Sequence, residues 1–95
     1  MDLVFEWDED KAKSNEAKHD VSFEEGKTVF NDQSSITIAD PVHSEHEDRW
    51  IDIGFPRRGR LVVVWYAERD GHIRLIGCRQ ATPAERRCYS DERYR

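Results

Sequence analysis

Hydrophobic and polar residues alternate along several short segments of this chain, and a period of two predicts strands that bury one face. The longest apolar run is Leu61-Val62-Val63-Val64-Trp65-Tyr66. Asp70-Gly71, a dipeptide typical of two-residue hairpin turns, separates that run from the next predicted strand. The five predicted strands cover residues 2–7, 35–39, 45–54, 61–66 and 73–79.

Three helices are indicated by the residues at their ends more than by any apolar face. Asp8 favours the N-cap position, and Ser22 with Glu25 has the spacing of a capping box. Thr82-Pro83-Ala84-Glu85 combines a cap, a proline at the first helical position and a glutamate at the third. The predicted helices cover about residues 9–18, 23–30 and 83–91.

The order of these elements predicts one α+β domain over residues 1–95. One strand is followed by two helices, then by four strands, and finally by a helix, which is the order β-α-α-β-β-β-β-α. We expect an antiparallel sheet with the helices packed on one face. A chain of 95 residues can bury only one modest core, so a single domain is expected.

Charged residues make up 37% of the chain, and the two signs are separated along it. Residues 1–48 hold 14 acidic residues and four lysines, whereas residues 49–95 hold eleven arginines and six acidic residues. Arginine binds phosphate in a bidentate manner and stacks on bases, so the arginine-rich C-terminal half is suited to contact nucleic acid. The acidic N-terminal half is suited to contact a basic partner. The alternative is an ordinary mixed surface that keeps a small protein soluble.

The rest of the composition argues against several other classes of protein. Cys78 and Cys88 have neither the CxxC nor the Cys/His spacing of a zinc site. No apolar run approaches the length of a membrane span, and the acidic start of the chain does not resemble a signal peptide. We therefore expect a cytoplasmic protein with reduced thiols and no membrane association.

A series of short motifs runs along nearly the whole chain. In order they are Phe5-Glu6-Trp7-Asp8, Lys11, Asn15, Lys18-His19, Val21-Ser22-Phe23-Glu24-Glu25, Val29-Phe30, Asp32, Asp40, His43-Ser44, Glu47-Asp48-Arg49-Trp50, Ile53-Gly54, Leu61-Val62-Val63-Val64, Glu68-Arg69, Ile73-Arg74-Leu75-Ile76, Arg79-Gln80-Ala81-Thr82 and Glu85-Arg86-Arg87. Each motif alone is a weak signal. Together, in this order and spacing, they resemble the family of BrnT toxins.

The resemblance implies the toxin of a bacterial type II toxin–antitoxin system, with a RelE-like α+β fold. Toxins of this family act as ribonucleases that inhibit translation, and neither a metal nor another cofactor is implied. The implied partner is an antitoxin of the BrnA type, in a complex of two toxins and two antitoxins. Operator DNA is then contacted only through the DNA-binding domain of the antitoxin.

This chain departs from the family pattern at three places. Asp20 follows Lys-His where the family usually has glycine, and Gly26 follows the Glu-Glu pair where alanine is usual. The strand that ends Ile-Ser-Ala-Arg in the family reads Ile76-Gly77-Cys78-Arg79 here. None of these changes removes a charged candidate residue.

Metal-independent RNA cleavage needs a base for the proton of the 2′-hydroxyl, positive charge for the developing phosphorane, and an acid for the leaving 5′-oxygen. The RNA supplies the nucleophile, so no serine or cysteine is required. We expect an endoribonuclease that uses this chemistry. The candidate catalytic residues are Arg74, Arg79, Glu47, Arg49 and His19, and the candidate RNA contacts are Lys18, Arg69 and Tyr89.

Arg74 and Arg79 are the leading candidates for binding phosphate and transition-state charge. The alternative is that each pairs with an acid such as Glu68 or Glu47 and only ties the sheet together. The two arginines are five positions apart, so a regular strand places them on opposite faces. Only a bulge near Gly77, or the end of the strand at Arg79, brings both into one site.

The other candidates also have structural alternatives. Glu47 and Arg49 lie two positions apart and share a strand face, so they can act as base and phosphate ligand or form a cross-strand ion pair. His19 suits either acid–base chemistry or a helix C-cap. Tyr89 can stack on a base, donate a proton or pack in the core.

Two other classes of function stay open. A RelE-like scaffold without catalytic activity could serve only to hold its antitoxin and the operator complex. A metal-dependent nuclease is conceivable because His43 and His46 lie in a loop rich in acidic residues. The acidic half of the chain is a poor RNA surface, so we expect it to face solvent or basic parts of the antitoxin. An antitoxin interface at residues 61–79 would contradict this expectation.

Overall fold

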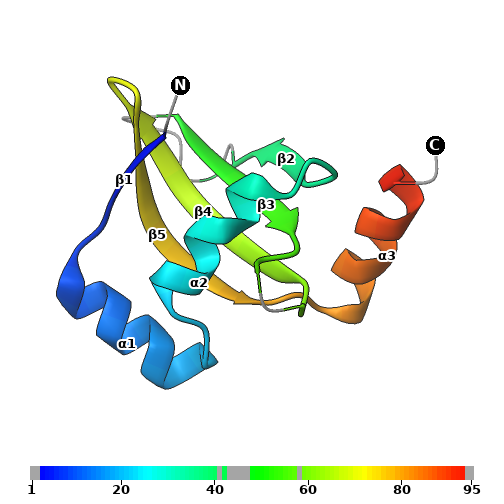
Figure 1. Ribbon diagram of the computed structural model, residues 1–95, viewed down its shortest axis with the longest axis horizontal. Coiled ribbons are helices and arrows are strands. Elements are labelled where there is room, and N and C mark those ends of the chain that lie inside the picture. The colour runs from blue at the N-terminus through cyan, green and yellow to red at the C-terminus, as the bar shows by residue number, and fades with distance from the viewer. Residues whose placement is uncertain (1–2, 41, 43–47, 58, 94–95) are drawn as a thin grey trace.

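The computed structural model describes residues 3–40, 42, 48–57 and 59–93, and these form a mixed α+β fold, which confirms the predicted class. Within them, five strands make one sheet in the order β1-β5-β4-β3-β2, accompanied by three α-helices and a short 3-10 helix, η1 (Figure 1). In chain order the elements are β1 (Val4–Glu6), α1 (Glu9–His19), α2 (Phe23–Lys27), η1 (Thr28–Asn31), β2 (Ile36–Ala39), β3 (Arg49–Gly54), β4 (Val62–Arg69), β5 (His72–Gln80) and α3 (Pro83–Arg93).

The sheet is antiparallel except at one edge. β2, β3, β4 and β5 form an antiparallel meander, whereas β1 pairs with β5 in parallel. The prediction of an antiparallel sheet therefore holds for four strands and is wrong for β1. A parallel pair needs a long connection between its strands, and here the helices and the rest of the meander provide that connection.

The two faces of the sheet carry different side chains and have different covers. One face, which we call the core face, packs against α1, α2 and η1, and from β4 it carries Val62, Val64 and Tyr66. The opposite face takes the alternate residues of β4, which are Val63, Trp65 and Ala67. We call it the arginine face because it also carries Arg49 of β3 and Arg74 and Arg79 of β5.

α3 packs on the arginine face, and it stands apart from α1 and α2 in Figure 1. Its Tyr89 is only 4% exposed and lies in a cluster with Ile53 and Val63. The prediction that all helices share one face is therefore wrong. The reason lies in the sequence: the segment Leu61–Val64 is apolar and buried at every position, so both faces of β4 need a cover.

The three predicted helix starts are confirmed by their hydrogen bonds. The side-chain oxygens of Asp8, Ser22 and Thr82 each accept from the backbone N–H three residues on, at 3.0, 3.0 and 3.2 Å. The second helix is shorter than predicted, because α2 is followed by the tighter turn of Thr28–Asn31.

A β-bulge in β5 resets the alternation of side chains along that strand. Trp65 of β4 pairs with Gly77, but its neighbour Tyr66 pairs with Leu75, so Ile76 is an extra residue without a partner on β4. Residues on either side of the bulge that are an odd number of positions apart therefore share a face. β5 therefore places Leu75 and Cys78 on the core face and Arg74 and Arg79 on the arginine face, which a regular strand does not allow.

One side chain of α1 covers the part of the β5 edge that β1 leaves open. The amide nitrogen of Asn15 donates to the carbonyl oxygens of Cys78, at 2.9 Å, and Val21, at 3.1 Å, while its amide oxygen accepts from the N–H of Cys78 at 3.2 Å. This single amide takes the place of a neighbouring strand. It also ties α1, none of whose residues is buried, to the sheet.

Helix α2 contacts β5 at a glycine. A Cβ atom on Gly26 would lie 3.2 Å from Sγ of Cys78 and 3.7 Å from Cγ2 of Val64. Burial raises the pKa of the Cys78 thiol to about 12, so the thiol stays protonated and packs as a small apolar group. The missing side chain of Gly26 is what makes room for this sulfur.

We predict that Asn15→Ala lowers the free energy of unfolding by about 1–3 kcal/mol, because the N–H of Cys78 and the carbonyl of Val21 lose their partner. Urea unfolding followed by circular dichroism measures the change. Ser14→Ala, at an exposed neighbouring position of the same helix, is the control for the helix propensity that alanine adds. Equal stability of the two variants would contradict the prediction.

Candidate functional site

A row of five side chains crosses the arginine face in register. Ala67 of β4 pairs with Arg49 of β3 and with Arg74 of β5, and Arg74 pairs with Glu6 of β1. Asp40 extends the row beyond β3, because its N–H donates to the carbonyl of Arg49 at 2.9 Å. The row thus has a small residue in the centre, an arginine on each side of it, and a carboxylate at each end.

The small side chain of Ala67 separates the two arginines of this row. Neighbouring strands lie about 4.8 Å apart, so the Cα atoms of Arg49 and Arg74 are separated by roughly 10 Å. Arginine side chains are long enough to converge on one group held above the methyl of Ala67. Two guanidinium groups in this arrangement are suited to grip a phosphate from both sides.

Glu6 holds Arg74 and a histidine together at the β1 end of the row. Nη1 of Arg74 donates to Oε2 of Glu6 at 3.2 Å, and Nδ1 of His72 lies 3.3 Å from Oε1 of the same carboxylate. The side chains of Arg74 and His72 are 32% and 49% exposed, so both remain accessible. The three groups together can accept a proton, donate a proton and stabilise an anion.

Arg79 lies on the same face but is held by other contacts. Its two terminal nitrogens donate to the carboxylate of Glu85 at 2.7 and 3.0 Å, and its guanidinium lies 4.9 Å from the ring centre of Trp65. These hydrogen bonds hold the pKa of the Glu85 carboxyl below its ordinary value. Arg79 pairs with Val63, four residues before Ala67 on β4, so it stands about 13 Å along the strand from the row.

The sequence leaves open whether Arg74 and Arg79 lie on the same face of the sheet, and the bulge at Ile76 answers this question. Because of the extra residue, Arg74 and Arg79 share one face although they are five positions apart. Each arginine also has an acidic partner, as the structural alternative anticipates. Those partners are Glu6 for the first and Glu85 for the second.

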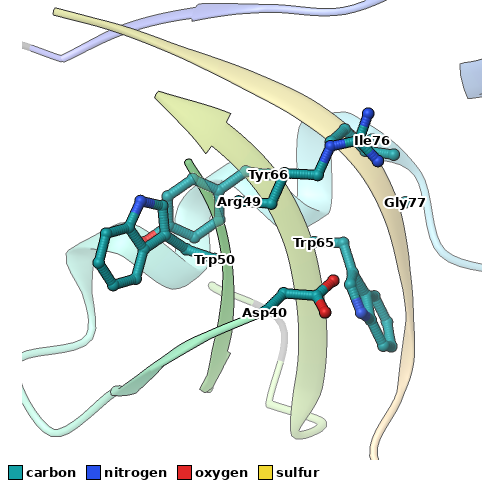
Figure 2. Close-up of a pocket in the computed structure, with 7 residues that line it drawn as sticks. All are labelled: Asp40, Arg49, Trp50, Trp65, Tyr66, Ile76 and Gly77. Carbon is teal, nitrogen blue, oxygen red and sulfur yellow. The ribbon is translucent and has the colours of Figure 1, made fainter. Parts of the chain in front are cut away.

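A cavity of about 160 Å³ lies beside the row. The residues that line it are Asp40, Arg49, Trp50, Trp65, Tyr66, Ile76 and Gly77 (Figure 2). Asp40 is only 6% exposed, and Figure 2 shows its carboxylate pointing toward the ring of Trp65. The side chain of Arg49 extends toward Ile76 in the same view. The cavity therefore presents an aromatic ring and a carboxylate next to the two arginines of the row.

Several predicted site residues lie away from the row. Lys18 and His19 end α1, which packs against the core cluster through Ala12 and against the open edge of β5 at Cys78 through Asn15, four residues along the strand from Arg74. Tyr89 lies on the buried side of α3 and its hydroxyl donates to the carboxylate of Asp32 at 2.9 Å, which is the core packing named as its alternative role. Glu47 lies in the segment 43–47, outside the described residues, as do both histidines of the acidic loop.

Four residues of this surface are absent from the candidates that the sequence predicts, namely Glu6, His72, Asp40 and Trp65. They enter the site through strand pairing, and pairing between distant segments has no local signal in the chain. Arg69, which is a predicted RNA contact, does lie on the arginine face, two positions beyond Ala67 at the exposed end of β4.

Among the residues that the structure describes, no three side chains of histidine, cysteine, aspartate or glutamate are grouped closely enough to hold a metal ion. Cys78 and Cys88 are both free thiols, the first buried and the second exposed. None of the helices in the described part of the chain is long and apolar enough to cross a membrane.

Comparisons with known proteins point to one family. A family model described as "Ribonuclease toxin, BrnT, of type II toxin-antitoxin system" matches residues 7–85. The chain is also similar to the crystal structure of the Brucella abortus ribonuclease toxin, BrnT, with a TM-score of 0.63 and 20% sequence identity, over 85% of this chain and 99% of that chain. At this identity the likeness concerns the fold. No curated protein matches the chain, and the relation to RelE folds stays a prediction.

We predict that Glu85→Gln destabilises the protein at neutral pH and has little effect in acid. The folded-state pKa of Glu85 lies below its ordinary value of 4.5, so the ionised carboxylate stabilises the fold above pH 4.5. That contribution is lost as the pH falls through the lowered pKa, so the difference from wild type shrinks in that range. We expect a difference of about 1 kcal/mol at neutral pH.

Urea unfolding at a series of pH values from about 7 to about 3 measures this difference. Glu16→Gln, at an exposed position of α1, is the control for the change in net charge. A difference between wild type and Glu85→Gln that stays constant over the whole series would show that the pair with Arg79 contributes no pH-dependent stability.

Proposed function

Because the chain belongs to the BrnT family of ribonuclease toxins of type II toxin–antitoxin systems, we propose that it cleaves RNA on the arginine face, without a metal ion, and so inhibits translation. The observation that carries this proposal is the cross-strand row in which Arg49 and Arg74 flank Ala67. An RNA strand offers one phosphate per nucleotide, and two guanidinium groups beside one small residue are suited to hold it.

The reaction uses the 2′-hydroxyl of the substrate as its nucleophile. The 2′-oxygen attacks the adjacent phosphorus, the bond from phosphorus to the 5′-oxygen of the next nucleotide breaks, and a 2′,3′-cyclic phosphate forms. A base removes the proton of the 2′-hydroxyl, and an acid protonates the leaving 5′-oxygen. DNA has no 2′-hydroxyl and is therefore not a substrate.

Glu6 and His72 are the acid–base groups that touch the row. One carboxylate oxygen of Glu6 contacts Arg74 at 3.2 Å and the other contacts His72 at 3.3 Å, so proton transfer and charge stabilisation fall in one place. We assign the two proton transfers to Glu6 and His72, and the charge on the phosphoryl oxygens to Arg74 and Arg49. His19, the histidine favoured by the sequence, ends α1, which contacts β5 at Cys78 and not at Arg74 or His72 among the hydrogen bonds of the described residues.

Arg69 and Arg79 extend the positive surface on either side of the row and are proposed to bind flanking phosphates. Arg79 is already oriented by Glu85 and by the ring of Trp65, so little side-chain freedom is lost when it binds. Contacts of this kind position the strand and carry no sequence information.

Membership in this family implies an antitoxin, and we propose one of the BrnA type in a complex of two toxins and two antitoxins. Operator DNA would be bound only through that antitoxin. Outside the arginine face, the exposed charges of α1 and α2 are a further surface on which the antitoxin can bind; they alternate in sign and include Glu9, Asp10, Glu16 and Glu24 beside Lys11, Lys13, Lys18 and Lys27. Such a toxin acts in the cytoplasm, where translated RNA is found.

The alternative function is a binding module that has no catalytic activity. It is favoured by one observation, that Arg74 and Arg79 are each engaged with a carboxylate and so could serve only to tie β5 to β1 and α3. The two functions differ in whether the purified protein cleaves RNA.

We predict that Arg74→Ala lowers the rate of RNA cleavage at least about 100-fold, because it removes positive charge from the transition state. The measurement uses labelled RNA, EDTA and protein freed of antitoxin. Arg87→Ala, at an exposed position of α3, is the matched control and should keep the wild-type rate. Circular dichroism confirms that both variants are folded.

Cleavage by wild type and Arg87→Ala alone, leaving 2′,3′-cyclic phosphate or 3′-phosphate ends, supports the proposal. Cleavage by Arg74→Ala at the wild-type rate would show that the row is not part of the active site. Cleavage that EDTA abolishes would indicate a metal-dependent nuclease. If neither free RNA nor RNA on translating ribosomes is cut, the protein is a binding module.

We also predict that His72→Asn lowers kcat about 100-fold and changes KM for RNA by less than about threefold, because His72 moves a proton and does not hold the phosphate. His19→Asn, at the C-terminal end of α1, should leave both constants unchanged. Steady-state cleavage of a short labelled RNA gives kcat and KM. The opposite result, a loss of kcat with His19→Asn only, would move the acid–base site to α1.

A further inference from the structure

The cavity beside the row contains a carboxylate that phosphate binding does not use. Asp40 is 6% exposed, lies in the wall of the cavity, and is the cross-strand neighbour of Arg49. A negative charge at this depth repels a phosphate and accepts hydrogen bonds from neutral N–H groups. A carboxylate has about four lone-pair sites, so it can serve a ligand in addition to neighbours in the protein.

The same cavity contains a surface on which a ring can stack. Trp65 lines it, and the guanidinium of Arg79 lies 4.9 Å from the centre of the indole. A cavity of about 150 Å³ is known to hold one benzene molecule, so about 160 Å³ is the scale of a single ring system. Bases of single-stranded RNA stack on aromatic side chains in this way.

We propose that this cavity binds one RNA base beside the phosphate held by the row, and that Asp40 selects guanine. The inference rests on the proposed function, because the base must belong to the strand whose phosphate Arg49 and Arg74 hold. Arg49 belongs both to the row and to the cavity wall, so a base in the cavity has its own backbone at the row.

Guanine is selected because of the donors on its Watson–Crick edge. Its N1–H and its N2 amino group are adjacent donors, so both can reach the two oxygens of one carboxylate. Adenine and cytosine offer one amino donor beside a ring nitrogen that accepts, and uracil offers one N–H between two carbonyls. Each of these three places an acceptor against the Asp40 carboxylate, and a buried acceptor that faces another is unfavourable.

Binding of RNA that cannot be cleaved tests this inference. Short 2′-O-methyl oligouridines, which lack the nucleophilic hydroxyl, carry one central guanosine, inosine, adenosine, cytidine or uridine. Fluorescence anisotropy with antitoxin-free protein should show the guanosine oligonucleotide binding about tenfold more tightly than the uridine one. Inosine, which keeps N1–H but lacks the N2 amino group, should lose most of that preference.

The isosteric variant Asp40→Asn should reduce the preference for guanosine to about twofold or less, because an amide has one acceptor in place of two. Equal affinity for all five oligonucleotides overturns the inference. A preference that survives Asp40→Asn also overturns it. Equal weakening toward every base would make Asp40 a positioning residue for Arg49 and would remove it from base selection. If Asp40→Asn does not fold, the wild-type protein still tests the inference. Equal binding of the guanosine and inosine oligonucleotides would then overturn it.

This inference and the proposed function fail in different ways. RNA cleavage by a protein that shows no base preference in the binding assay refutes the guanine site alone. A preference for guanosine in a protein that cleaves neither free nor ribosome-bound RNA refutes the ribonuclease and leaves the guanine site standing.

Discussion

The bulge at Ile76 fixes which residues of β5 face the core and which face the arginine surface. Without the extra residue, Leu75 and Cys78 could not both lie on the core face, and Arg74 and Arg79 could not both lie on the other. The core and the candidate site therefore depend on the same irregularity. In a strand with regular alternation, either the core residues or the arginines beyond position 76 would lie on the wrong face. The reason is that a shift of one position turns every later side chain to the opposite face.

The arginine face is arranged before any ligand arrives. Glu6, near the start of the chain, and Glu85, near its end, bind the two arginines of β5 at 2.7–3.2 Å. Guanidinium groups held in this way lose little freedom on binding, and they keep their geometry when a phosphate approaches. Glu6 also offsets the positive charge of Arg74 within the row, and Glu85 offsets that of Arg79 farther along β5.

Local signals in the sequence were sufficient to predict the helices and strands. They were insufficient to predict which strands pair and which face each helix covers. The helix caps and the Asp70-Gly71 turn, where φ is positive at both residues, depend on neighbours within four positions and could be predicted. Whether β1 joined β5 in parallel depended on residues almost seventy positions apart, and so did the meeting of Glu6 with His72. The side taken by α3 could have been inferred from Leu61–Val64, because a run that is apolar at every position needs cover on both faces.

The contact between α2 and β5 joins two features that look unrelated along the chain. Relative to the BrnT pattern, alanine is replaced by glycine at position 26 and by cysteine at position 78, and a Cβ at the first would lie only 3.2 Å from the sulfur of the second. The small residue on the helix and the larger one on the strand thus fill one shared space, at the close packing usual for protein interiors. A side chain added at position 26 requires the sulfur at position 78 to shift or to be replaced by something smaller. Positions 26 and 78 therefore behave as a single packing unit, and neither can be enlarged without a change at the other.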